Sequence, residues 1–127
     1  MWSLSTGGPR IPLRTDAREM TLQVILATNQ ISVAVAGRVN VDSSPNLRSA
    51  ILGLLARKTA PIIHIDLSGV SYLDTSGLAT LLEALKAARK RSVNLRVTGI
   101  GGAGRTLAEI AQLDTIFRAW GSEVEFR

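Results

Sequence analysis

The sequence contains no cysteine, few aromatic residues and no long hydrophobic run. The lack of cysteine excludes a disulfide framework, a thiol nucleophile and a thiolate metal site. The longest apolar stretches are a few residues long, as in residues 51–56, and cannot span a membrane as a helix. Residues 1–18 lack the continuous apolar core of a secretory signal. We therefore expect a cytoplasmic protein.

The length of 127 residues suits one domain. Hydrophobic residues make up 46% of the chain and aromatic residues only 4%, so the core must consist mainly of Leu, Ile, Val and Ala. We expect a flexible leader over residues 1–18 and one domain over residues 19–127. The formal charge of +5 leaves nucleic acid, anionic lipid and acidic protein surfaces open as partners.

Patterns typical of strands and helices alternate along most of the chain. Residues 22–27 and 31–36 predict two strands joined by a tight turn, with Gly37 ending the second strand. Ser44-Pro45 predicts the first turn of a helix. The nearly continuous apolar run 62–67 predicts a central strand covered on both faces by helices.

The second half of the chain continues this alternation. Residues 68–73 form the expected connection to a helix over residues 76–91, which has leucines at helical spacing. Further patterns predict a strand, a helix and a final strand or turn, at residues 93–97, 106–112 and 116–117. The chain is thus predicted to be α/β, with helices packed against a sheet.

Residues 73–78 carry the clearest chemistry, since they place an aspartate, a threonine and a serine at the start of the best predicted helix. Asp74 or Thr75 can cap the free N–H groups there. A phosphate on Ser76 would be favoured by the same donors and by the helix dipole. The alternative is that these residues are only a capping sequence.

The segment 65–78, together with residues 37–45 and 111–114, resembles the STAS family of anti-sigma factor antagonists over roughly residues 20–120. The resemblance implies a single STAS-like domain with a mixed sheet of four to five strands and helices mainly on one face. It also implies a non-enzymatic partner switch. Unphosphorylated, the protein would bind an anti-sigma serine kinase of the GHKL ATPase type; phosphorylated, it would release that kinase, and a serine phosphatase would reset it.

The resemblance identifies Ser76 as the expected phosphorylation site. It implies partner contacts at Asn40, Asp42, Ser43, Ser44, Asp74, Thr75, Gly77, Leu78 and Thr80. The sequence departs from the family at Arg38, where an acidic residue is common, and at Asn40, where aspartate is common. STAS domains also resemble a small cytoplasmic subunit of a bacterial lipid-trafficking ABC transporter, which is the alternative function.

The remaining motifs are better explained by structural roles than by catalysis or ligand binding. Residues 99–104 have the G-x-G-x-x-G spacing, but no following βαβ unit supports a dinucleotide site, so a flexible connection is expected. His64 is expected to be a satisfied core or sheet-edge residue. The basic cluster 86–91 is expected to be a solvated helix face. We therefore predict no catalytic residues, cofactor, metal, direct nucleic-acid contact or membrane insertion, and leave homodimer formation open.

Overall fold

The computed structural model describes residues 4–5, 20–57 and 60–127. The described residues form one sheet in which the strands lie in chain order from β1 to β6. Strands β2 and β3 pair antiparallel, whereas the other neighbouring pairs are parallel. The predicted mixed sheet is confirmed, with five strands of four or more residues and the two-residue β1 at one edge. Apart from β1, the expected leader 1–18 lies outside the described residues.

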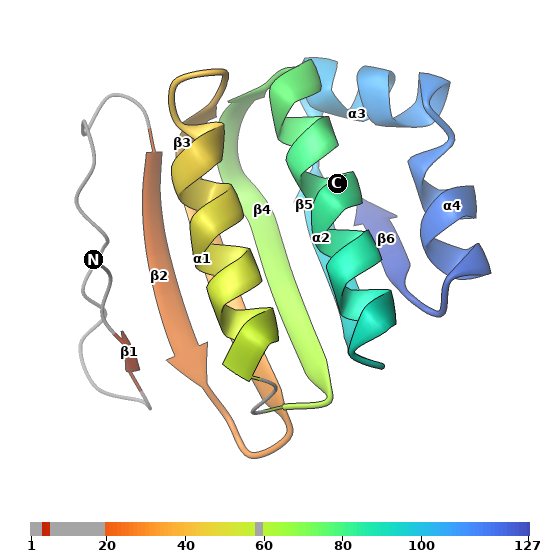
Figure 1. Cartoon of the computed structure of the whole chain (residues 1–127). Coiled ribbons are helices and arrows are strands. Elements are labelled where there is room, and N and C mark those ends of the chain that lie inside the picture. Colours follow the sequence, from red (N-terminus) through yellow and green to blue (C-terminus); the bar gives the residue numbers. More distant parts are fainter. Residues whose placement is uncertain (1–3, 6–19, 58–59) are drawn as a thin grey trace.

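The elements follow one another as strands and helices. The strands are β1 (Leu4–Ser5), β2 (Met20–Leu26), β3 (Gln30–Val39), β4 (Ile62–Leu73), β5 (Asn94–Ile100) and β6 (Glu123–Phe126). The helices are α1 (Ser44–Arg57), α2 (Thr75–Lys90), α3 (Gly102–Ile110) and α4 (Leu113–Ala119). Figure 1 shows the helices on one side of the sheet.

The core lies between the helices and the covered face of the sheet. Buried and partly exposed residues alternate along β2 and along the first half of β3 and β4, as expected for strands with one covered face. The buried side chains are almost all aliphatic, and Phe117 is the one fully buried aromatic among the described residues. The prediction of an aliphatic core is therefore confirmed.

Strand β4 differs from its prediction in two ways. It runs for 12 residues to Leu73, so the segment 68–73 is strand rather than connection. It is also covered on one face only, because Ile63, Ile65 and Leu67 are buried while the residues between them are partly exposed. The extra length comes from continued pairing with β3, where register shifts accommodate the irregular sequence.

Gly37 lies within β3 rather than at its end. It has a φ of +93°, a conformation that glycine adopts without a steric penalty. The β3–β4 register shifts on either side of it, between Ala34 and Ala36 and between Gly37 and Arg38. A bulge of this kind lets the strand bend and continue, and β3 reaches Val39.

The C-terminal third also departs from prediction. Ile116 and Phe117 belong to α4, because the i,i+4 pair Leu113 and Phe117 buries one side of a short helix. The strand of this region comes later, as β6, and pairs with β5. The glycine-rich segment 99–104 is not a flexible connection, because all of it except Gly101 belongs to β5 or α3. Gly99 lies within β5 with φ +84°, and a Cβ there would lie 2.5 Å from the Ser68 nitrogen.

Candidate functional site

The candidate site forms where β3 and β4 end side by side. Because these strands are parallel, Val39 pairs with Leu73 at the same edge of the sheet. The Asp74 N–H donates to the Val39 carbonyl oxygen over 3.3 Å, which continues the pairing by one residue. The loop 40–43 and the start of α2 therefore follow two strands that end at the same edge of the sheet.

Asp74 caps α2. Its Oδ1 accepts hydrogen bonds from the Ser76 N–H at 3.0 Å and the Gly77 N–H at 3.3 Å, while its backbone is extended. The Ser76 hydroxyl also donates to the same Asp74 oxygen in a short hydrogen bond. The cap prediction is confirmed for Asp74. The N–H groups expected to favour a phosphate on Ser76 are therefore already bonded to a carboxylate.

The loop 40–43 is held by the Asn40 side chain. Its Oδ1 accepts from the Asp42 N–H at 2.9 Å and from the Ser43 N–H at 3.1 Å. The Ser43 hydroxyl donates to the Arg38 carbonyl oxygen at 2.7 Å and lies 3.3 Å from Asn40 Oδ1. In all of the bonds that the Asn40 side chain makes here, its Oδ1 is the acceptor. An asparagine can therefore accept the same hydrogen bonds as the aspartate that is common in the family.

Helix α1 begins at Ser44, as predicted, but Ser43 occupies the position before it. The Ser43 carbonyl accepts from the N–H groups of Asn46 and Leu47, and Pro45 lies in the first turn, where its missing N–H has no cost. Ser43 and Ser44 are both buried. The Ser43 hydroxyl also accepts from the Asn40 N–H at 3.0 Å and so ties the loop to the start of α1.

The predicted contact residues divide by exposure. Asp42 and Thr75 are exposed, and Asn40, Asp74 and Ser76 are partly exposed. Leu78 and Thr80, each 6% exposed, face the interior, as do Ser43, Ser44 and Gly77. The site surface thus consists of the loop 40–42 and residues 74–76, and the buried residues shape it without presenting side chains to a partner.

Sequence reasoning missed one exposed apolar residue at this surface. Val41 is 70% exposed at the tip of the loop held by Asn40. A valine among Asn40, Asp42 and Ser43 was the signal, because a short polar loop rarely needs an apolar side chain for folding. Isolated exposed apolar residues are common, but Val41 lies beside the candidate phosphorylation site.

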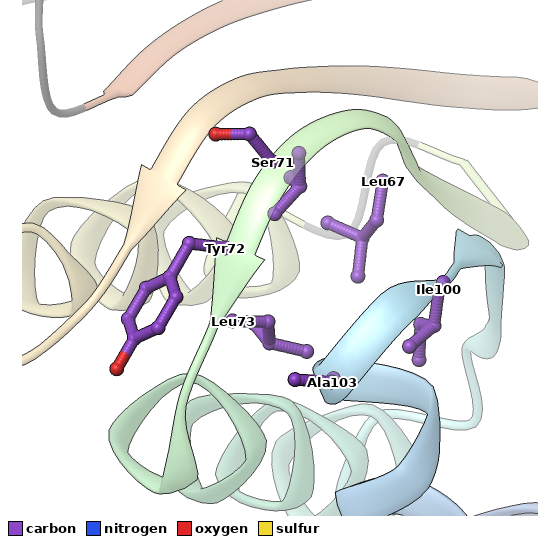
Figure 2. Close-up of a pocket in the computed structure, with 9 residues that line it drawn as sticks. Leu67, Ser71, Tyr72, Leu73, Ile100 and Ala103 are labelled. Atoms are coloured by element: carbon purple, nitrogen blue, oxygen red, sulfur yellow. The ribbon is translucent and has the colours of Figure 1, made fainter.

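Arg38, the other departure from the family pattern, lies at the end of β3. Its guanidinium carbon is 4.2 Å from the centre of the Tyr72 ring on β4, within the range of a cation–π contact. Figure 2 shows the Tyr72 ring directed away from the neighbouring cavity. Arg38 and Tyr72 therefore form a pair on the surface of the sheet, next to the site.

A small apolar cavity lies behind the site, between β4 and the start of α3. It is lined by Leu67, Leu73, Ile100 and Ala103 among others, and its volume is about 30 Å³. A cavity of this size is large enough to hold a water molecule. Leu73 lies between two glycines here, because a Cβ on Gly77 would overlap its Cδ1 and one on Gly104 would lie 2.8 Å from its Cβ.

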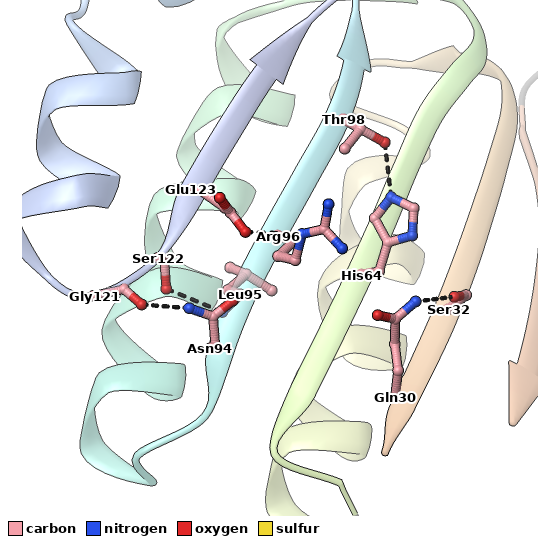
Figure 3. A network of polar contacts seen from close by, with 10 residues as sticks. All are labelled: Gln30, Ser32, His64, Asn94, Leu95, Arg96, Thr98, Gly121, Ser122 and Glu123. Atoms are coloured by element: carbon pink, nitrogen blue, oxygen red, sulfur yellow. Dashed lines mark hydrogen bonds and ion pairs between the residues drawn. The ribbon is translucent and has the colours of Figure 1, made fainter. Parts of the chain in front are cut away.

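His64 lies on the uncovered face of the sheet. Its Nε2 is 2.7 Å from the Thr98 hydroxyl on β5, and Figure 3 shows the polar contacts that run across this face from β3 to β6. Partial burial, and then the positive charge of Arg96, lower the pKa of His64. A satisfied histidine was predicted, and the hydrogen bond to Thr98 confirms it.

The fold and the paired loops define the class of protein. A mixed sheet has helices on one face, and an aspartate-capped helix follows the central strand with a serine in its first turn. The sequence profile described as "Mlab, STAS domain" matches residues 22–118. The chain belongs to the STAS domain family.

Curated relatives and solved structures include anti-sigma factor antagonists. The chain is 32% identical over 98 residues to the anti-sigma-B factor antagonist of Listeria monocytogenes, which covers 77% of this chain and 85% of that protein. An anti-sigma factor antagonist from Mycobacterium paratuberculosis superposes with a TM-score of 0.71 at 27% identity, covering 82% and 87% of the two chains. SpoIIAA in its unphosphorylated form has the same fold, with a TM-score of 0.66 at 12% identity and coverage of 81% and 86%.

None of the helices within residues 20–57 and 60–127 is both long enough and apolar enough to cross a bilayer.

Proposed function

We propose that this chain is a cytoplasmic anti-sigma factor antagonist that acts by phosphorylation-controlled partner switching. With Ser76 unphosphorylated, it binds an anti-sigma factor that is also a serine kinase of the GHKL ATPase type. Phosphorylation of Ser76 releases that partner, and a serine phosphatase reverses the modification. The chain itself performs no catalysis.

The observation that carries this proposal is the geometry of Ser76. Its side chain is partly exposed in the first turn of α2, and its hydroxyl donates to Asp74 Oδ1. This bond fixes the hydroxyl at the start of α2, where the Asp74 N–H joins the helix to Val39, the residue before the loop 40–42. A kinase can therefore reach Ser76 without unfolding any element.

A phosphate on Ser76 would change the surface by electrostatics. It adds about 1.5 to 2 negative charges and removes the hydroxyl proton that Asp74 now accepts. Because Asp74 Oδ1 also holds the N–H groups of Ser76 and Gly77, the phosphate competes with this carboxylate for the helix terminus. Repulsion between the two groups displaces one of them, and a partner that fitted the hydroxyl loses its contact.

Val41 supplies an apolar contact for the same partner. It is 70% exposed, and the hydrogen bonds to Asn40 hold its loop in one conformation before binding. A preformed apolar tip beside a polar switch gives affinity without ordering cost. We place the docking surface over Asn40, Val41, Asp42, Asp74, Thr75 and Ser76.

The test uses the full chain as bait in extracts of its native host. Ser76→Ala is expected to enrich an ATP-binding serine kinase, and Ser76→Glu is expected to lose it. Ser49→Glu is the matched control, because Ser49 is an exposed serine on α1 that is not part of the proposed docking surface. Intact mass should show one phosphate on the unsubstituted chain and none on Ser76→Ala. Equal capture by Ser76→Ala and Ser76→Glu would contradict the proposal.

A second candidate is the STAS subunit of a bacterial lipid-trafficking ABC transporter. It is favoured by one observation, that the profile matching residues 22–118 carries the Mlab description. The same extracts distinguish the two functions. Capture of a permease and a transport ATPase, independent of the residue at position 76, would support the transporter subunit.

A further inference from the structure

A second surface lies at the opposite end of α2 from the candidate site. It is a hollow lined by Lys86, Arg89 and Lys90 of α2 and by Trp120, which follows α4. A helix rises 1.5 Å per residue, so Lys90 is about 20 Å along α2 from Ser76. We refer to these four residues as the basic hollow.

The tryptophan of the basic hollow comes from a distant part of the sequence. The guanidinium carbon of Arg89 lies 4.8 Å from the centre of the Trp120 ring, which is cation–π distance. Trp120 is partly exposed and Arg89 is exposed. The contact joins the end of α2 to the end of α4. It holds the Arg89 guanidinium against the Trp120 ring, which is the apolar part of the hollow.

The cations of the basic hollow have no ion-pair partner among residues 20–57 and 60–127. Glu83, which lies one turn before Lys86 on α2, is bound to Arg48 at 2.6 Å, and Lys86 acts on it only through the longer-range attraction of their charges. Arg91 follows directly and adds to the local charge. A compact group of cations without ion pairs of their own favours binding of a group with several negative charges.

The shape of the surface selects among anionic partners. The hollow is open to solvent and has a volume of about 410 Å³, which leaves room for side chains of a bound segment. Bases of single-stranded nucleic acid stack on open aromatic faces, whereas Arg89 covers one face of Trp120. A membrane surface favours protruding aromatic residues, whereas Trp120 lines a concavity. Carboxylate side chains of a protein segment suit both the volume of the hollow and its charge.

We propose that the basic hollow binds an acidic protein segment, in which carboxylates pair with Lys86 and Lys90 and an adjoining apolar group contacts the indole of Trp120. This binding is independent of the phosphorylation of Ser76. The surface therefore serves a second partner, or a second region of the same partner, about 20 Å from the switch.

The test follows the fluorescence of Trp120 in the full chain carrying Trp2→Phe, which leaves Trp120 as the one tryptophan. A synthetic Glu-rich peptide is the probe. We expect a saturable change in emission that weakens as salt is raised. Lys90→Glu and Lys86→Glu should each weaken the affinity about tenfold or more, a difference of about 1.4 kcal/mol.

Arg57→Glu is the matched control. Arg57 is an exposed cation in the last turn of α1, as Lys90 is in the last turn of α2, so both substitutions change the net charge equally. Arg57→Glu should leave peptide affinity within about twofold. Equal weakening by Arg57→Glu and Lys90→Glu, or the absence of a saturable signal, would overturn the proposal. Tighter binding of an oligonucleotide or of phosphatidylglycerol vesicles than of the peptide would also overturn it.

Discussion

The two glycines within α1 and α2 should respond oppositely to the same substitution. A Cβ on Gly53 would have no atom within 4 Å, whereas a Cβ on Gly77 would overlap Leu73 Cδ1 and lie 3.0 Å from Val39 Cγ1. Both residues are helical. The same Gly→Ala substitution at the two positions therefore compares two effects: the backbone preference for alanine in a helix and the steric cost of an added methyl group.

Gly53→Ala should raise the free energy of unfolding by about 0.5–1 kcal/mol, since alanine loses less backbone entropy in a helix. Gly77→Ala gains less, because Gly77 lies in the first turn of α2. It also forces Leu73 to move, and overpacking of a filled core costs about 1–3 kcal/mol. We expect a net loss of about 1–2 kcal/mol for Gly77→Ala.

Urea unfolding followed by far-UV circular dichroism measures both changes. A second pair of variants tests the cause. Leu73→Ala alone should cost about 2–5 kcal/mol, but Leu73→Ala combined with Gly77→Ala should cost less than the sum by at least about 1 kcal/mol. The new methyl group would then occupy space that the leucine has left.

Two results would refute this reasoning. If Gly77→Ala stabilised the protein as much as Gly53→Ala, Leu73 would have room to move and would not be confined by the glycine. If the effects of Leu73→Ala and Gly77→Ala simply added, the two positions would not share the same space. In either case the close packing behind Ser76 would not depend on Gly77.

Two further predictions concern polar residues. The pKa of His64 lies below its ordinary value in the folded state, so the unfolded chain binds more protons near that value. The contribution of His64 to stability should therefore be complete above about pH 6.5 and should be lost as the pH falls through its folded-state pKa. His64→Gln should flatten this part of the pH profile of thermal unfolding. A profile that His64→Gln leaves unchanged would exclude the histidine as the cause of the pH dependence. Asn40→Ala should lower the free energy of unfolding by about 0.5–1.5 kcal/mol, because it removes the side-chain acceptor of the Asp42 N–H and leaves the Ser43 N–H with only the Asn40 backbone carbonyl. Asn40→Asp should retain most of this stability in urea unfolding, and an equal loss in both variants would show that the loop does not depend on the acceptor oxygen.

The sequence was sufficient to predict the parts of this fold with strong local signals. The leucine stripe of α2, the hairpin of β2 and β3 and the start of α1 were predictable because periodicity and capping residues act locally. Asp74 was predictable as a cap for the same reason. The STAS resemblance supplied the proximity of the loop 40–43 to Ser76, which the parallel pairing of β3 and β4 now explains.

The parts that were not predictable depend on distant contacts. Residues 68–73 lack a strand pattern, yet they pair with a bulged β3 that holds them extended. Ile116 and Phe117 are β-formers by propensity, but Phe117 is helical because it buries its ring in the core. The basic hollow needs Trp120, whose meeting with Arg89 no local pattern indicates.

The order of strands in the sheet has a consequence for synthesis of the chain. Each strand from β2 to β6 lies beside the strand that precedes it in the sequence, so no strand must wait for a later one before it can pair. The proposed docking surface and its buried supports all lie between residues 38 and 80. During translation this surface can form once α2 has left the ribosome, while β5, β6 and the tryptophan of the basic hollow are still being made. Nascent chains truncated after α2, or after β5, should therefore form the proposed docking surface although they lack the tryptophan of the basic hollow.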